Sequence, residues 1–469
     1  MYMSRSFFAN LCALRGLCVD LPRFAQARRF ISFTFCILLV AAVPICSAAP
    51  RSHEPRMSFL DNGTIRVGVD LNLGGAITWL SRSADRENVI NSYDWGRQVQ
   101  MSYYGGPIPF VPPGKQVAPY WKGLGWNPIQ SGDDFGHASS VLESSNDGRQ
   151  IYVKCIPMQW PLDDVPGECT FECWLTLDGS TVCVRSRLAN ARSDHTPYGA
   201  RDQELPAVYT NAPYSRIVSY TGKQPFAGEP VADVEAKQPP NWNRWFATEH
   251  WAALVDKQGW GLGVCNPGCL RFIGGFAGKP GEGDASSANC GYLAPSREEI
   301  LDHNVVHEYR YELILGTINE IRERATKGGP VLPSWRFAES RDGWNFRNAS
   351  DAGWPLSGEW EVKFEKGDPQ ILSPLFCRPV EEIPSVMIEA AFTTQESQAQ
   401  LFWSTYDENG FTQERSIFFP IQNDGSHHEY RIKLSDSPTY RGSIIQLRLD
   451  PANSSAGTIQ LKSIRFIKE

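Results

Sequence analysis

The sequence lacks the features that mark several large classes of protein. It has no long run of lysine or arginine and its formal net charge is -7, whereas a nucleic-acid binder needs a basic surface to displace counterions. It also has no serine nucleophile elbow, phosphate-binding loop, glycine-rich dinucleotide fingerprint or His-x-x-x-His helix. These absences argue against nucleic-acid binding and against esterase, kinase, dehydrogenase and zinc-protease functions.

After the first fifty residues, no apolar segment is long enough to span a bilayer. The beginning of the chain instead resembles a secretory signal, with basic residues before an apolar run from Phe30 to Val43 and small residues after Pro44. An uncleaved membrane anchor is the alternative. We expect residues 1–49 to be a signal peptide. The remainder would then be secreted, periplasmic or at the cell surface, with no stable membrane insertion after cleavage.

A chain of 469 residues is too large to depend on disulfides, although an even number of cysteines in an exported protein permits them. Of the twelve cysteines, four fall in the predicted leader and eight remain. Their spacings match no small disulfide scaffold, and the two Cys-x3-Cys pairs lack the usual histidine partners of a zinc site. We expect buried thiols, or one or two bridges, rather than a bound metal.

What the chain does contain is a β-rich pattern. Apolar residues alternate from Ile65 to Leu71 before a Gly74-Gly75 step, and ECTFECWLTL and STVCVRSRLAN form a hairpin pattern around Asp178-Gly179. Only the segment after Thr317, INEIRERATKGG, has helical composition. These patterns predict an all-β domain over residues 55–326.

A second module follows a linker at residues 327–334, which is rich in glycine and proline. Eight short strand candidates lie between Glu359 and Ile467, separated by turns. Strands at this spacing predict a β-sandwich of the jelly-roll type over residues 335–469.

Two sets of motifs resemble known families. NGTIRVGVDLNLGGAITWLS and ENVINSYDWGRQ resemble the galactose-mutarotase-like supersandwich proteins, which include aldose epimerases, glycosidase domains and polysaccharide lyase domains. GWNF, QLFW and IIQLRLDP resemble the galactose-binding-like jelly rolls of secreted carbohydrate-active enzymes. The resemblance implies an N-terminal β-supersandwich and a C-terminal β-sandwich jelly roll. It also implies structural calcium as an option in the second module, with no other cofactor required. The Asn-His motif of the epimerases is absent, which argues against a simple sugar mutarotase.

The stretch from Tyr93 to Asp164 crowds aromatic, amide, arginine and aspartate residues between glycines and prolines. That composition predicts long ordered loops, and aromatic faces beside polar groups suit an oligo- or polysaccharide ligand. The alternative is that these are structural loops whose aromatic residues belong to the core. The predicted sugar-binding residues, from this stretch and from two later segments, are Arg97, Gln100, Tyr104, Trp121, Trp126, Gln159, Trp160, Arg201 and Asn266.

Glycoside cleavage commonly uses two carboxyl groups, one protonated and one ionised. We expect such groups to lie in loops near aromatic residues. Glu204 is the first candidate, although an Arg201–Glu204 ion pair is the structural alternative. Asp134 and Asp164 lie in acidic clusters of the loop-like stretch, where turn formation is the alternative. His303 is a candidate acid or base, because a histidine side chain can take up or release a proton near neutral pH, with a structural role as its alternative.

The sequence therefore predicts a secreted carbohydrate-active protein that cleaves or modifies a glycan. Glycoside hydrolysis is favoured, and a polysaccharide lyase using Arg97, Tyr103 or Tyr104 and His303 is the second option. A non-catalytic glycan-binding protein of the cell surface or periplasm is the alternative from another class. A structural role in the cell envelope is the third.

Overall fold

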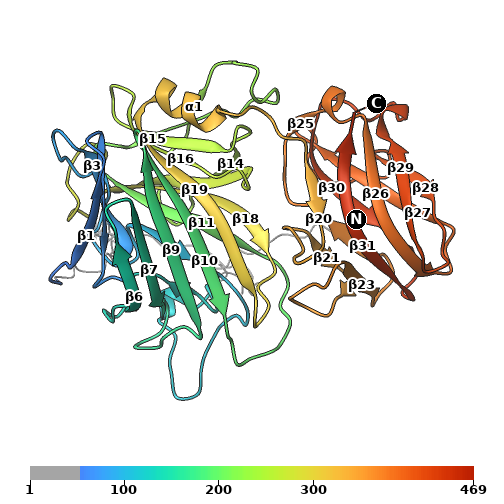
Figure 1. Cartoon of the computed structure of the whole chain (residues 1–469), viewed down its shortest axis with the longest axis horizontal. Helices are drawn as coiled ribbons and strands as arrows, with labels where there is room; N and C mark the ends of the chain where they lie inside the picture. The colour runs from blue at the N-terminus through green and yellow to red at the C-terminus, as the bar shows by residue number, and fades with distance from the viewer. Residues whose placement is uncertain (1–52, 469) are drawn as a thin grey trace, which may run out of the picture. The chain divides into compact units, whose positions relative to one another are not determined.

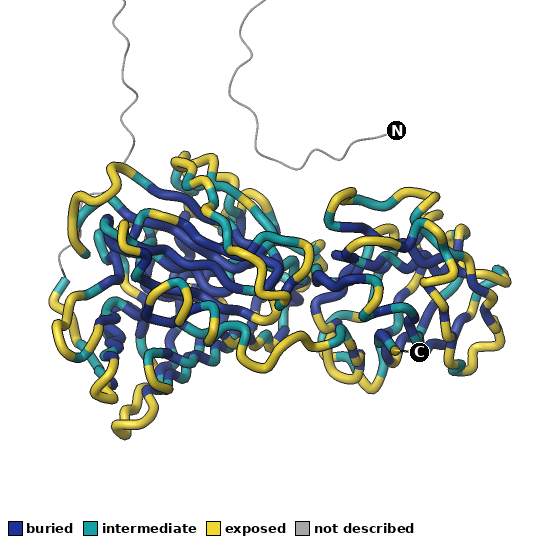
Figure 2. The backbone as a smooth tube through the Cα atoms, turned by 90° about the horizontal axis from the view of Figure 1, so that it is seen from above, coloured by how far each residue is buried: buried dark blue, intermediate teal, exposed yellow. Residues whose placement is uncertain are grey.

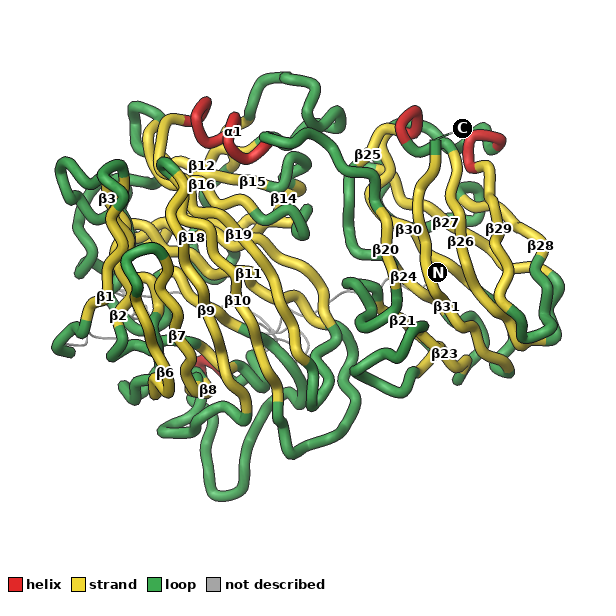
Figure 3. The backbone as a smooth tube through the Cα atoms, viewed as in Figure 1, coloured by secondary structure: helices red, strands yellow, loops and turns green. Residues whose placement is uncertain are grey.

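The computed structural model describes residues 53–468. These residues form two β-sandwiches, each made of two antiparallel sheets (Figures 1 and 3). The predicted all-β fold class is thereby confirmed. The predicted signal peptide lies outside the described residues.

The first sandwich consists of a ten-stranded and a nine-stranded sheet. The ten-stranded sheet runs, in spatial order, β1 (Met57–Asp61), β2 (Ile65–Asp70), β3 (Ala76–Arg82), β4 (Val99–Ser102), β11 (Arg201–Asn211), β18 (Cys290–Glu299), β17 (Arg271–Ala277) and β14 (Asn243–Phe246), with β5 (Pro128–Ile129) and β8 (Met158–Gln159) attached beside β4. The nine-stranded sheet runs β13 (Ala232–Val234), β12 (Arg216–Ser219), β15 (Trp251–Val255), β16 (Trp260–Cys265), β19 (Val306–Thr317), β10 (Thr181–Asn190), β9 (Cys169–Asp178), β7 (Gln150–Ile156) and β6 (Ser140–Asn146).

The second sandwich consists of two six-stranded sheets. One contains β22 (Ala349–Ser350), β23 (Trp360–Phe364), β31 (Gly457–Ile467), β26 (Ser385–Thr394) and β29 (His427–Lys433), with β20 (Ser334–Arg336) beside β31. The other contains β21 (Asn345–Arg347), β24 (Gln370–Leu372), β30 (Ser443–Asp450), β27 (Gln398–Thr405) and β28 (Ser416–Pro420), with β25 (Arg378–Pro379) beside β30.

The hairpin of β9 and β10 shows why these sequences form strands. Its residues pair from Thr181–Asp178 at the turn onward, and Gly179 adopts φ +57° there, a conformation that glycine adopts without a Cβ clash. Along both strands, buried and partly exposed side chains alternate. The buried set joins the hydrophobic core between the two sheets of the first sandwich (Figure 2). A separate core fills the second sandwich.

Helix α1 (Ile318–Thr326) forms where the helical composition predicts it. It begins with a capping box, in which the Thr317 hydroxyl accepts the Glu320 N–H and the Glu320 carboxylate accepts the Thr317 N–H. Its Ile321 is fully buried in a small cluster with residues of β12, β15 and β16. Among residues 53–468, no helix has the length and hydropathy of a membrane span.

Two loop predictions are wrong. The stretch from Tyr93 to Asp164 contains β4 to β8 as well as loops, and the segment around Glu204 is not a loop but the central strand β11. Proline and polar residues made these segments look irregular. In β11, however, the polar residues alternate between two faces, as a strand requires.

The expectation of buried thiols, rather than one or two disulfides, is confirmed for all but one of the described cysteines. All eight cysteines of the described chain are free thiols, and all but Cys183 are buried.

Candidate functional site

The ten-stranded sheet has a face that is turned away from the main core. On β11 and β18, Leu205, Val208 and Leu293 belong to the main core. Tyr292 and other residues of alternate position form a separate cluster, with Tyr209 packed against it. Because side chains of a strand alternate between faces, this second cluster defines the opposite face, which we call the outer face.

Glu204 lies on the outer face, half-buried, with two tyrosine hydroxyl groups on its carboxylate. The Tyr104 hydroxyl donates to Glu204 Oε2 at 3.0 Å, and the Tyr292 hydroxyl donates to Glu204 Oε1. Burial raises the pKa of Glu204 above its ordinary value, while the two tyrosine hydrogen bonds oppose that rise. A carboxyl group placed in this way is suited to give or take a proton.

The backbone at Glu204 is irregular, and Asn266 holds it. The pairing of β11 with β18 shifts register between Glu204 and Val208, and such bulges re-aim side chains beside functional sites. Asn266 Nδ2 donates to the carbonyl oxygen of Leu205 at 2.7 Å, and Asn266 Oδ1 accepts the Gly268 N–H at 3.0 Å. Asn266 therefore positions Glu204 through the backbone rather than offering its amide to a ligand.

Three aromatic rings pack in a row on the outer face, and the hydroxyl group of the middle one, Tyr292, bonds to Glu204. The ring centroids of Tyr209 and Tyr292 are 4.9 Å apart, and those of Tyr292 and Trp242 are 5.0 Å apart. The absence of a side chain at Gly275 allows this packing, because a Cβ there would lie 2.5 Å from the Trp242 ring and 2.1 Å from the Lys237 carbonyl oxygen. Tyr292 is buried, whereas Tyr209 and Trp242 are partly exposed, and partly exposed rings beside polar groups are the surface on which sugar C–H faces stack.

Sequence analysis missed Tyr292 and Trp242. The strand pattern of CGYLAP places Tyr292 on one face of β18, but only the pairing of β18 with β11 brings its hydroxyl to Glu204. Trp242 precedes β14, in a segment rich in proline and asparagine that carries no periodic signal.

Asp202 is a second carboxylate on the outer face, two residues before Glu204 on β11. Arg271 Nη1 lies 2.9 Å from Asp202 Oδ1, and Arg244 Nη1 lies 3.0 Å from Asp202 Oδ2. Each carboxylate oxygen has two acceptor positions, so these ion pairs leave Asp202 able to accept a further hydrogen bond.

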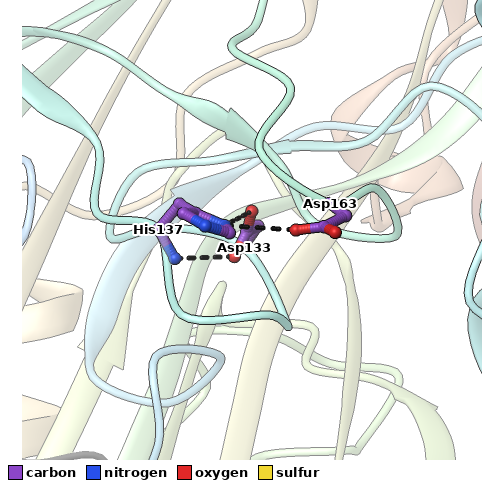
Figure 4. Close-up of side chains that lie close together, drawn as sticks. All are labelled: Asp133, His137 and Asp163. Atoms are coloured by element: carbon purple, nitrogen blue, oxygen red, sulfur yellow. Dashed lines mark hydrogen bonds and ion pairs between the residues drawn. The ribbon is translucent and has the colours of Figure 1, made fainter. Parts of the chain in front are cut away.

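Asp133, His137 and Asp163 form a separate cluster around the buried carboxylate of Asp133 (Figure 4). Its Oδ1 accepts the backbone N–H groups of residues 135–137, and its Oδ2 contacts His137 Nδ1 at 2.9 Å and accepts the Asp164 N–H at 2.9 Å. Asp163 lies 3.6 Å from His137, so the three side chains bring possible metal ligands within 4.8 Å of one another. The hydrogen bond from Asp133 raises the pKa of His137. These bonds account for the cluster as the anchor of a loop.

The other predicted catalytic residues occupy different places from Glu204. Asp134 accepts the Trp121 indole N–H at 2.8 Å. Asp164 is exposed, in a turn where its φ is +53°. His303 lies between β18 and β19 and stacks on His195, with ring centroids 3.9 Å apart. The structure therefore does not pair Asp134, Asp164 or His303 with Glu204.

Of the predicted binding residues, Tyr104 is the one bonded to Glu204. Trp126 and Trp160 are buried, whereas Trp121 is partly exposed beside Trp160. The remaining polar side chains bond to the backbone, namely Arg97 to Ala288, Gln100 to Trp95 and Arg97, Gln159 to Asn127, Arg201 to Gly105 and Leu124, and Asn266 to Leu205 and Gly268. Their bonds indicate that they support the loops and strands of the site.

No protein-family model matches the chain, and no curated protein matches it. Solved structures similar to part of it include a putative aldose 1-epimerase from Escherichia coli K12, at 13% identity and a TM-score of 0.35, covering 56% of this chain and 100% of that one. A galactose mutarotase-like protein from Lactobacillus casei matches at 11% identity and a TM-score of 0.36, covering 55% of this chain and 100% of that one. A galactose mutarotase-like protein from Clostridium acetobutylicum matches at 9% identity and a TM-score of 0.35, covering 56% and 96%.

At these identities and TM-scores the similarities carry no argument about activity. The resemblance of the second sandwich to galactose-binding-like modules stays a prediction. What the chain does must be argued from its own side chains.

Proposed function

We propose that the chain is a carbohydrate-active enzyme in which Glu204 exchanges a proton with a sugar bound on the outer face of the ten-stranded sheet. The observation that carries the proposal is the half-buried Glu204 carboxyl, bonded by Tyr104 and by Tyr292, the middle ring of a row of three. Its raised pKa brings the group closer to the neutral range in which a general acid or base works well.

The ligand class follows from what surrounds the carboxyl. The partly exposed Tyr209 and Trp242 supply ring faces, with the buried Tyr292 packed between them, and tyrosine hydroxyl and carboxylate groups supply hydrogen bonds. Sugars present C–H faces and hydroxyl groups in the same alternation. An oligo- or polysaccharide therefore fits this surface.

Hydrolysis by paired carboxyl groups is the reaction that we propose first. Asp202 lies two residues from Glu204 along the same strand, so the two side chains leave the same face from Cα atoms roughly 6.5–7 Å apart. Inverting glycosidases separate their two carboxyl groups by about 6.5–9.5 Å. In this scheme Glu204 is the protonated acid and Asp202 the ionised partner.

Elimination by a polysaccharide lyase is the second reaction, and a specific contact supports it. Two tyrosine hydroxyl groups bond directly to Glu204, so a carboxylate base and a tyrosine acid stand side by side. The products distinguish the two reactions, because hydrolysis releases reducing ends without a double bond and elimination releases an unsaturated sugar.

We also propose that the protein is exported. This part of the proposal is supported by the leader-like sequence before residue 50 alone. Amino-terminal sequencing of the mature protein tests it, with a new terminus near residue 50 expected and an intact Met1 contradicting it.

The catalytic proposal is tested by Glu204→Gln, which keeps the shape of the side chain and removes its proton exchange. The wild type and the variant are incubated with a panel of polysaccharides, and both turnover and glycan affinity are measured. We expect the variant to lose about 10²-fold to 10⁴-fold in turnover while it still binds glycan. Glu143→Gln, at an exposed position of β6, is the matched control and should keep full turnover.

The alternatives give different results. A glycan-binding protein would bind members of the panel without turning any over. A structural protein of the cell envelope would neither bind nor convert them, and that outcome would refute the proposed function.

A further inference from the structure

A cavity of about 250 Å³ is lined by residues of the ten-stranded sheet and of the second sandwich. The sheet contributes Arg271 of β17 and Ser296 of β18, and the second sandwich contributes Arg347 of β21 and Phe411. Small-molecule sites usually measure about 300–1,000 Å³, so this cavity suits one sugar ring rather than a longer chain.

Strand pairing and an ion pair connect the cavity lining to the proposed site. Ser296 of β18 pairs directly with Glu204 of β11, and residues paired in this way have Cα atoms roughly 4.5–5.5 Å apart. Arg271, on the cavity wall, is also the ion-pair partner of Asp202. A glycan that places one ring at Glu204 would therefore place the next ring in this cavity.

Arginine dominates the charge of the lining. Arg271 and Arg297 hold the carboxylates of Asp202 and Glu299, but each guanidinium has five N–H donors and these pairs use only some of them. Arg347 is exposed, and its side chain has no hydrogen bond or ion pair within the part of the chain that the structure describes. Planar guanidinium groups bind carboxylate and sulfate oxygens through paired donors.

A serine hydroxyl group in the lining is also available to a ligand oxygen. Ser296 is 4% exposed, and its hydroxyl group has no hydrogen-bond partner among the described residues. A buried hydroxyl without a partner is unfavourable, and a ligand oxygen would satisfy it. The acidic lining residue Glu298 lies 3.5 Å from the Asn345 amide, which donates to it.

We infer that this cavity is a subsite for an anionic sugar residue, whose carboxylate or sulfate group pairs with Arg347 and Arg271 while its neighbour in the glycan lies at Glu204. The position of the neighbouring sugar at Glu204 rests on the proposed function. The inference narrows the substrate from glycans in general to acidic glycans.

The test compares the full chain with Arg347→Gln by calorimetry against three probes: an oligogalacturonate, a sulfated glucan oligosaccharide and neutral maltotetraose. We expect the wild type to bind at least one acidic probe roughly tenfold or more tightly than the neutral one. Arg347→Gln should remove that preference. Arg431→Gln, an exposed arginine of β29 outside the cavity, is the matched control and should keep it.

The two acidic probes identify which anionic group is bound. Preference for the oligogalacturonate indicates a carboxylate, and preference for the sulfated probe indicates a sulfate. Equal affinity for all three probes, or an acidic preference that survives Arg347→Gln, would overturn the inference. If neutral glycans are turned over through Glu204 without any acidic preference, only the subsite fails. If acidic probes bind through Arg347 but no glycan is turned over, the catalytic proposal fails and the subsite stands.

Discussion

Removing the hydroxyl of Tyr292 should raise the pKa of Glu204 further. In the wild type, burial raises this pKa and the Tyr292 hydroxyl is the first of the hydrogen bonds that oppose the rise. Tyr292→Phe keeps the ring that packs on Tyr209 and Trp242 and deletes the donor alone. The change therefore isolates the contribution of one hydrogen bond to the protonation of the proposed catalytic group.

The magnitude follows from the strength of such a bond. A hydrogen bond to a charged group contributes about 1.5–3 kcal/mol. Loss of the bond should favour the protonated form of Glu204 by about that free energy, so its pKa should rise further. Because the folded pKa is already above the unfolded value, ionised Glu204 destabilises the fold as pH rises through the folded pKa. The variant should therefore lose more stability at pH 7 than at pH 4.

Two assays measure the effect. Carbon NMR of the Glu204 carboxyl gives its pKa without any knowledge of the substrate, and the pH dependence of kcat/KM gives it again once a turned-over glycan is known. Tyr209→Phe is the matched control, since its ring belongs to the same row and no hydrogen bond joins it to Glu204 among the described residues. A pKa that stays unchanged in Tyr292→Phe, or that moves equally in the control, would refute the reasoning.

Three further predictions concern the support of the site and the stability of the fold. Gly275→Val should displace Trp242, because the new side chain would collide with the Trp242 ring and with the Lys237 carbonyl oxygen. Calorimetry should then show weaker glycan binding, while circular dichroism shows an intact fold. Unchanged affinity would show that Trp242 does not belong to the site. Burial lowers the pKa of His250 to about 4, so the free energy of unfolding in urea should fall as pH drops from about 6.5 towards 4, and His250→Asn should flatten that dependence. A slope that persists in His250→Asn would assign it to other groups. Thr317→Ala removes the cap of α1 and should cost about 1 kcal/mol in urea unfolding, whereas equal stability would show that the cap contributes nothing.

The sequence predicted the strands well where they are long and half-buried. All eight strand candidates of the second sandwich are present. Seven of them span five or more residues, and alternation over that length is a strong local signal; the eighth, β24, has only three residues and is shorter than predicted. The short strands β20, β21, β22 and β25 were missed, since two or three residues cannot display a period.

The site was predicted less completely because it depends on pairing between distant strands. Glu204 was identified from its own surroundings, but the alternative Arg201–Glu204 ion pair rested on closeness in sequence. In the strand, Arg201 donates to the carbonyl oxygens of Gly105 and Leu124, because residues three apart point to opposite faces. The partners of Glu204 are instead Tyr104, 100 residues away, and Tyr292, 88 residues away, and a single sequence does not specify that register.

The most direct test of the central claim is the structure of Glu204→Gln with a bound oligosaccharide. We predict that the sugar lies on the outer face, with a ring against Tyr209 or Trp242 and a reacting oxygen or carbon-bound hydrogen within reach of residue 204. For a proton exchanged between heavy atoms, that reach is about 2.6–3.2 Å. A sugar seated elsewhere, such as over the exposed Tyr120, with nothing at residue 204, would contradict the account.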